Sequence, residues 1–234
     1  MVVEIWSDVM CPFCYIGKRK FESALADFKN AENIEIIWKS FQLAPDMETS
    51  PDKSINEFLA AHKGISLEEA KAMNGHVADR ANEVGLNFNF DQTIPANSFK
   101  AHRFGHFAKQ KGVQNAAEEA LFKAYFTEGK NIDDTDTLVQ IGQALGLDPE
   151  ETKSVLESAQ FEQEVTYDIY EARQIGVRGV PFFVFDRKLA VSGAQESSAF
   201  AEVLEKTYTE WSANNPPKME IIDGPSCEAG KDCG

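Results

Sequence analysis

The sequence predicts an α/β fold in which a large, all-helical insertion divides one sheet-containing domain. Three observations lead to this prediction. Strand and helix patterns alternate over residues 1–50, helical patterns alone fill 51–160, and a helix, two short strands and a last helix fill 161–212. A segment rich in Pro, Gly and Asn follows at 213–234. We therefore expect a divided α/β domain, a helical insertion and a C-terminal tail.

The first fifty residues have the order strand, helix, strand. Residues 2–6 (VVEIW) are β-branched and aromatic, as is typical of a buried strand. Apolar residues recur with a helical period over 15–28, and strand character returns at 34–43. Two strands joined through a helix pair in parallel, because the helix carries the chain back to the starting end of the sheet. We therefore expect a parallel pair at the N-terminus.

Helical patterns continue from Ser54 to Gly176. The sequence SLEE, which begins at Ser66, predicts a capping box with Glu69, and Gly85 is placed to end that helix. The last long helix of this stretch is predicted over 161–176.

Two apolar runs then follow within residues 180–195. A short polar turn at 186–188 separates them, which is the pattern of a β-hairpin. A final amphipathic helix is predicted over 197–211.

Composition narrows the classes of partner. The formal charge of −15 argues against nucleic acids and anionic membranes, since both bind basic surfaces. No run approaches the roughly 18 apolar residues that span a bilayer, and Met1 leads directly into VVEIWSDVM without a basic leader. We therefore expect a cytoplasmic protein that binds neither nucleic acid nor membrane.

The four cysteines form two pairs, Cys11 with Cys14 and Cys227 with Cys233. Cytosolic thiols are kept reduced, so a close pair is more often catalytic or metal-binding than a structural disulfide. Cys11 lies where a helix begins, and free N–H groups and the helix dipole stabilise a thiolate there. Pro12 suits the first helical position, since its missing N–H costs nothing.

The spacing places Cys14 one helical turn after Cys11, on the same face. Cys14 can then attack a mixed disulfide formed on Cys11. We expect Cys11 to be an exposed nucleophile and Cys14 a buried resolving residue.

A zinc site and an inert structural pair are the competing interpretations. Structural zinc needs four ligands, but the second cysteine pair lies in the tail and the histidines lie in the helical block. A turn between strand and helix is also an unusual place for a structural disulfide. We predict no metal ion. The histidines are His62, His76, His102 and His106.

Pro181 begins a predicted strand, and the residues alone leave two interpretations open. It could start an edge strand, or it could follow a cis peptide bond beside the cysteine pair. In the second case the preceding backbone could pair with an extended peptide.

Five motifs in order resemble the DsbA-like thiol-disulfide oxidoreductases and, more narrowly, their cytoplasmic FrnE-type branch. They are SDVMCPFCYIGK, FQLAPD, IPANSFKAHR, LFKAYFTEGKNI and GVPFFVF. The resemblance covers about residues 2–211. It implies a thioredoxin-like fold with a helical insertion, a Cys11/Cys14 active site, and a cis bond between Val180 and Pro181.

The resemblance also implies a substrate groove shaped by Val180 and Pro181, with Pro12 and Phe13 beside it. One departure concerns Phe13, because strongly oxidising periplasmic relatives have histidine at this position. A histidine there can donate to the thiolate, and phenylalanine cannot. We expect a weaker oxidant than those relatives, which equilibration with glutathione would measure.

Asn97, Ser98 and His102 lie together at the start of an insertion helix. Asn97 or Ser98 is most simply an N-cap, and His102 an ordinary histidine. However, related glutathione-using isomerases and kappa-class glutathione transferases line their clefts from this block, so these three residues are candidates for substrate binding. Asp8 either caps a turn, which we prefer, or tunes the cysteine pair.

Cys227 and Cys233 enclose a short segment and either act as an auxiliary redox couple or are merely solvent-exposed thiols.

The predicted function is exchange of disulfides with protein, peptide or small-thiol substrates. We expect no bound cofactor, with glutathione as a candidate cosubstrate, and a monomer or homodimer. One alternative is a glutathione-dependent isomerase or transferase that acts on a small aromatic compound. A second is a chaperone or binding module that needs no redox chemistry.

Overall fold

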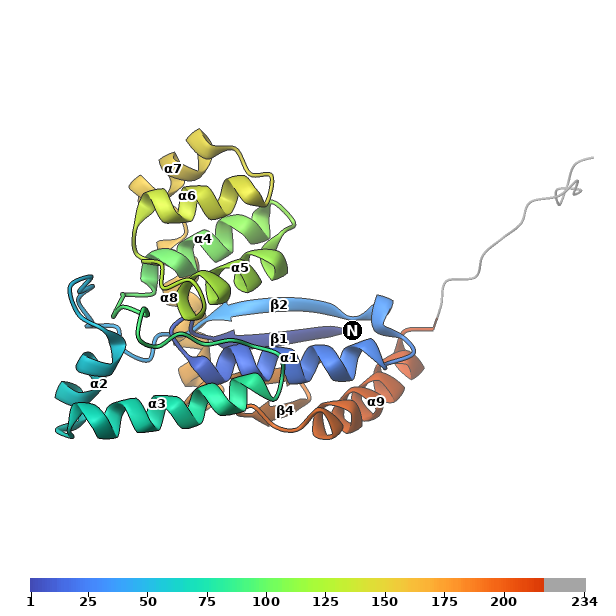
Figure 1. Cartoon of the computed structure of the whole chain (residues 1–234). Coiled ribbons are helices and arrows are strands. Elements are labelled where there is room, and N and C mark those ends of the chain that lie inside the picture. The colour runs from blue at the N-terminus through green and yellow to red at the C-terminus, as the bar shows by residue number, and fades with distance from the viewer. Residues whose placement is uncertain (217–234) are drawn as a thin grey trace, which may run out of the picture.

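The computed structural model describes residues 1–216, which contain a four-stranded mixed sheet with the order β2-β1-β3-β4 (Figure 1). β1 and β2 are parallel, with Val2 opposite Glu35, and the other two pairs are antiparallel. The strands are β1 (Val2–Ser7), β2 (Glu35–Ser40), β3 (Phe182–Phe185) and β4 (Leu189–Ser192). The predicted parallel pair and the predicted hairpin are confirmed.

Helices cover both faces of the sheet. Successive side chains of a strand point to opposite faces of the sheet. Ile5 and Phe183 point toward α1 (Pro12–Ala26) and α9 (Ser197–Asn214). Trp6 lies on the opposite face and packs with Ala172 of α8 (Glu162–Gln174). A short 3-10 helix, η1 (Ala31–Asn33), precedes β2. In Figure 1, α1 and α9 lie in front of the sheet and α8 lies behind it.

The predicted insertion folds as two helical groups. α3 lies beside α1 and packs against α2, while α4 to α7 form a bundle beyond β2 (Figure 1). The helices are α2 (Ile55–Lys63), α3 (Leu67–Asn82), α4 (Phe99–Gln110), α5 (Gln114–Phe126), α6 (Thr135–Ala144) and α7 (Pro149–Glu157). The capping box of Ser66 with Glu69 is present, and Gly85 has a positive φ of 76°. The exact unit boundaries stay predictions.

Aromatic rings fill the core between the sheet and its front helices. The Phe21 ring of α1 packs against Phe183, Phe185 and Phe200, and all four side chains are almost fully buried. Each such burial stabilises the fold by about 1.5–3 kcal/mol, so these contacts fix α1 on the sheet. Within residues 1–216, no helix combines the length and the apolar character needed to cross a membrane.

Candidate active site

The loop between β1 and α1 positions the two cysteines. Cys11 is the N-cap of α1, in an extended conformation, and Pro12 occupies the first helical position. The Cys11 N–H donates to the Asp8 carbonyl at 2.9 Å, and the Cys14 N–H donates to the Cys11 carbonyl at 3.0 Å. Both sulfurs are free thiols. The structure thus places Cys11 at the helix N-terminus and Cys14 one turn further on.

The Cys11 thiol is more enclosed than the sequence predicts. Cys14 is fully buried, as expected, but Cys11 is only 4% exposed rather than open to solvent. The reason is the segment that leads into β3, because the Cys11 thiol donates to the Val180 carbonyl at 3.6 Å. Burial and the neighbouring Cys11 raise the pKa of the Cys14 thiol well above its usual range. The Ser7 hydroxyl and the Asp8 amide oppose this effect.

The peptide bond between Val180 and Pro181 is cis, as the resemblance implies. Pro181 is buried, and its carbonyl accepts a hydrogen bond from Gly193 N at 2.8 Å. On α1, Gly17 faces this proline, since a Cβ built at Gly17 would lie 2.9 Å from Pro181 Cγ. Only glycine lets the two segments approach this closely. Sequence analysis missed Gly17, although a glycine three residues after Cys14 inside a helix was a usable signal.

Three half-buried residues are the predicted neighbours of the Cys11 thiol: Pro12 and Phe13 follow it in the chain, and the Val180 carbonyl lies 3.6 Å from its sulfur. Phe13 and Val180 both pack against the main core, so each is held in place while part of its surface stays accessible. Contact with substrate remains a prediction for all three.

Asn97, Ser98 and His102 lie at the start of α4. The Asn97 amide is already engaged, because it donates to the Met47 carbonyl at 2.9 Å and accepts from Phe99 N at 2.9 Å. Ser98 is the N-cap but makes no capping hydrogen bond, and it is 1% exposed. Asn97 lines a hollow of about 510 Å³, together with Gln42, Pro45, Met47, Glu48, Thr49, Phe99, Lys100, Arg103 and Asp133.

His102 is buried and contacts Asp8 rather than an open cleft. Its Nε2 lies 3.5 Å from Asp8 Oδ1. Burial lowers the pKa of His102, but the Asp8 carboxylate, with help from Glu118, raises it overall. The burial of Ser98 and His102 directs both toward the interior, so their contact with substrate stays a prediction.

Asp8 is fully buried and joins the cysteine loop to the segment after β2. Its carboxylate accepts from Leu43 N at 2.7 Å and from Met10 N at 3.3 Å. It therefore caps the turn before Cys11, as we preferred from the sequence. The contact with His102 extends this role, because it also connects the cysteine loop to α4.

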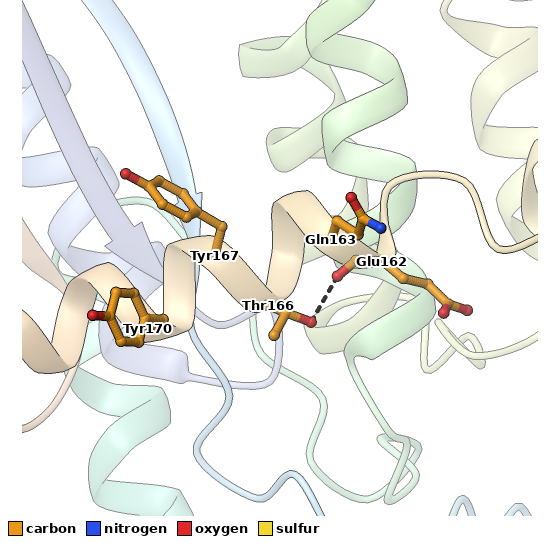
Figure 2. A pocket seen from close by; sticks show the side chains of 5 residues that line it. All are labelled: Glu162, Gln163, Thr166, Tyr167 and Tyr170. Atoms are coloured by element: carbon orange, nitrogen blue, oxygen red, sulfur yellow. Dashed lines mark hydrogen bonds between the residues drawn. The ribbon is translucent and has the colours of Figure 1, made fainter.

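A shallow hollow of about 500 Å³ lies on α8 (Figure 2). It is lined by Glu162, Gln163, Thr166, Tyr167 and Tyr170, and both tyrosine side chains are more than half exposed. The Thr166 hydroxyl donates to the Glu162 carbonyl at 2.7 Å. α8 covers the face of the sheet opposite α1, so this hollow is separate from the cysteines.

A family model described as the DSBA-like thioredoxin domain matches residues 2–205. The chain belongs to the DsbA-like thioredoxin domain family. The family and the thioredoxin-like fold predicted for this DsbA-like protein are therefore confirmed, and the FrnE-type branch stays a prediction.

A solved structure agrees with this assignment, and a second relative matches most of the chain. A probable DsbA oxidoreductase from Streptomyces coelicolor is 35% identical with a TM-score of 0.83, over 98% of this chain and 97% of that one. YwbO, an uncharacterized protein of Bacillus subtilis (strain 168), is 26% identical over 204 residues, which cover 86% of this chain and 94% of YwbO.

A more distant structure shares the fold. The cytosolic disulfide reductase DsbM from Pseudomonas aeruginosa, solved with GSH, is 16% identical with a TM-score of 0.64, over 89% of this chain and 100% of that one. At this identity the likeness concerns the fold alone.

Two predictions remain, one on a metal site and one on the C-terminal cysteine pair. Within the part of the chain that the structure describes, no group of three or more His, Cys, Asp or Glu side chains is arranged to hold a metal ion. Cys227 and Cys233 lie outside the described residues.

Proposed function

We propose that this DsbA-like protein catalyses thiol–disulfide exchange through Cys11 and Cys14. One observation carries the proposal: the Cys11 thiol lies at the N-terminus of α1 beside the Val180 carbonyl and the cis-proline, with Cys14 buried one turn below. In this position helix N–H groups stabilise the Cys11 thiolate. The nucleophile and the resolving thiol therefore have distinct environments.

The reaction with a substrate disulfide has two steps. The Cys11 thiolate attacks one substrate sulfur, which forms a mixed disulfide and releases the other sulfur as a thiolate. Cys14 then attacks Cys11, the bond between Cys11 and substrate breaks, and the substrate leaves reduced while the protein holds a disulfide. Oxidation of a substrate dithiol is the same sequence in reverse. Val180 and Pro181 would hold an extended substrate against Cys11.

We propose protein or peptide thiols and disulfides as substrates, with glutathione as a cosubstrate and no bound cofactor. Support for glutathione comes from DsbM, a relative in fold that was solved with GSH. DsbM is a cytosolic reductase, which supports the proposed cytoplasmic location.

The decisive experiment separates the two cysteines. Cys14→Ala is expected to accumulate a mixed disulfide on Cys11 when it meets a disulfide peptide, because the resolving thiol is gone. Cys11→Ser is expected to form none. Mass spectrometry of the quenched reaction reads both outcomes, and a Cys14→Ala protein that never becomes disulfide-linked contradicts the proposal.

The same variants distinguish the alternative functions. Turnover of a small aromatic compound with glutathione that persists in Cys14→Ala would favour a glutathione-dependent isomerase or transferase. Suppression of aggregation that is unchanged in Cys11→Ser would favour a redox-independent chaperone.

We also propose that Cys227 and Cys233 exchange electrons with the Cys11/Cys14 pair. The full chain with Cys227→Ala and Cys233→Ala is expected to reduce insulin more slowly than wild type. Equal rates of insulin reduction and of oxidative refolding would remove the auxiliary role.

A further inference from the structure

Leu43 presents an apolar side chain to solvent shortly after β2 ends. Among the large aliphatic side chains of residues 1–216 it has the greatest exposed fraction, 49%. A single exposed leucine is common on protein surfaces, so only its position in the fold can give it a meaning. That position is the edge of the sheet at which the cysteines lie.

Parallel pairing of β2 with β1 places Leu43 beside the cysteines. Because the two strands are parallel, the chain leaves both of them at the same edge of the sheet. Beyond β2, the Phe41 N–H donates to the Ser7 carbonyl at 2.9 Å, and the Leu43 N–H donates to Asp8 Oδ2 at 2.7 Å. Leu43 is therefore bound directly to the loop between β1 and α1, which carries Cys11.

Val180 flanks the same loop from the other side. β3 pairs with β1 on the side opposite β2, so the segment that leads into β3 approaches the loop from there. The Cys11 thiol donates to the Val180 carbonyl at 3.6 Å. Phe41 and Val180 both pack against the cluster that contains Trp6, and both are half-buried. Two partly apolar segments, one from each neighbour of β1, thus border the loop of Cys11.

The segment that carries Leu43 is also held in place. The Asn97 amide of α4 donates to the carbonyls of Pro45 at 3.1 Å and Met47 at 2.9 Å. Gln42 Nε2 in turn donates to Asn97 Oδ1 at 3.2 Å. A contact on a fixed segment loses less conformational entropy on binding than a contact on a mobile one. Leu43 is thus an exposed side chain on a pre-organised backbone.

This arrangement favours one kind of substrate residue. A substrate held in extended form by the Val180 backbone would continue across Cys11 toward Leu43. Leucine has neither donor nor acceptor, so a bulky apolar residue gains from contact with it, whereas a polar residue loses hydration without compensation. Glutathione has only glycine and a γ-linked glutamate beside its cysteine, so it offers no apolar side chain.

We propose that Leu43 is a specificity-determining residue, which selects peptide disulfides with a bulky apolar residue beside the reacting cysteine over polar peptides and glutathione disulfide. This inference rests on the proposed thiol–disulfide exchange and names its substrate class. The selected step is the first one. A bond forms between the Cys11 sulfur and the peptide sulfur, and the original disulfide breaks with its electron pair leaving on the other sulfur. Leu43 contacts the substrate and takes no part in these bond changes.

The test isolates this step in a protein with a single thiol. Full-length chain with Cys14→Ala, Cys227→Ala and Cys233→Ala keeps Cys11 as its one cysteine. The substrates are short neutral peptides whose cysteine is linked by a disulfide to 2-nitro-5-thiobenzoate. They differ in having leucine or serine immediately before or immediately after that cysteine. Attack on the peptide sulfur releases the coloured nitrothiobenzoate, whose absorbance gives the second-order rate constant.

Leucine is expected to react about tenfold faster than serine at one of the two positions, since partial burial of one large apolar side chain supports a factor of this size. Leu43→Ala is expected to reduce this preference to less than twofold. Leu43→Met keeps an apolar side chain of similar volume and is expected to retain the preference. Glutathione linked to the same nitrothiobenzoate is expected to react as slowly as the serine peptides, within twofold, in all three proteins.

Leu67→Ala is the matched control. Leu67 is also an exposed leucine, 36% accessible, but it begins α3 in the helical insertion. The tenfold preference is expected to remain in this variant. Alkylation of Cys11 by iodoacetamide, which carries no peptide, is expected to stay within twofold in every variant.

Each other outcome has a separate meaning. Equal rates for leucine and serine at both positions overturn the inference, and so does a preference that Leu43→Ala leaves unchanged. Equal slowing of iodoacetamide and of all peptides in Leu43→Ala marks a structural role and overturns it as well. Absence of a mixed disulfide with every substrate would instead contradict the proposed thiol–disulfide exchange.

Discussion

Gly17 lies so close to Pro181 that the site leaves no room for a larger side chain at this position. Its α-carbon faces Pro181, and a methyl group there would lie 2.9 Å from the proline ring. Gly17→Ala is therefore expected to displace the Val180–Pro181 segment from Cys11. Overpacking of this kind costs about 1–3 kcal/mol of unfolding free energy. Urea unfolding would measure the loss, and the rate of mixed-disulfide formation would measure the effect on the site.

Gly75 provides the matched control for this substitution. It lies inside α3, where a Cβ would have no neighbour within 4 Å. Gly75→Ala is expected to stabilise the protein by about 0.5–1 kcal/mol through helix propensity. If Gly17→Ala gave the same gain, the close approach to Pro181 would have no energetic consequence.

At the scale of elements, Glu119 joins α5 to α1. Its carboxylate accepts from Tyr15 at 2.6 Å, from Lys18 at 2.7 Å and from Arg19. Burial alone would raise the pKa of Glu119, but these donors lower it to about 2. Because the folded pKa lies below the unfolded value, the resulting stability is present above about pH 4.5 and is lost as the pH falls toward 2.

Glu119→Gln is expected to lower the unfolding free energy by about 2 kcal/mol at pH 7. The reason is that Lys18, whose side chain is only 3% exposed, then keeps Glu22 as its single acid partner. The expected loss is below that of an unpaired buried charge, because Glu22 remains and the Glu119 side chain is one third exposed. The loss is expected to shrink at pH 3. Glu151→Gln, which removes an exposed pair with Lys111, should cost less than about 0.5 kcal/mol. Equal effects of the two substitutions would contradict this account.

At the scale of the whole molecule, Asp168 links the sheet, the insertion and α8. Its carboxylate binds Lys39 Nζ at 2.7 Å and Ser40 N at 2.9 Å on β2, and it lies 3.1 Å from His106 Nε2 on α4. Burial would raise the pKa of Asp168, but His106 and Lys39 lower it overall. One side chain therefore holds three parts of the chain together.

Asp168→Ala is expected to destabilise the protein by about 2–3 kcal/mol, because the Ser40 N–H loses this acceptor and Lys39 keeps only Glu171, at 3.1 Å, as an acid partner. Because the folded pKa is lowered, the difference from wild type should fade below about pH 4. Unfolding curves at pH 7 and pH 3 measure both effects. Glu164→Ala, an exposed neighbour on α8, should change stability by less than about 0.5 kcal/mol, and a comparable loss there would contradict the assignment.

Sequence patterns predict the parts of this molecule that depend on local chemistry. The hydrophobic period identifies the strands and helices, and the Cys-Pro-Phe-Cys spacing places both thiols on the first turn of α1. The enclosure of Cys11 could not be predicted, because Val180 covers it from a segment 169 residues away. The contact between Asp8 and His102 could not be predicted for the same reason, because it joins the loop before α1 to α4, two segments far apart in the sequence.

The contact between Cys11 and Val180 also has a consequence for biosynthesis. The two residues are 169 positions apart, which a ribosome covers in roughly 10–30 s at about 5–20 residues per second. For that interval the nascent chain carries the Cys11 sulfur without its cover from the Val180–Pro181 segment. A ribosome-bound chain stalled before β3 should therefore be labelled by a maleimide at Cys11, whereas the released protein should be labelled there far more slowly.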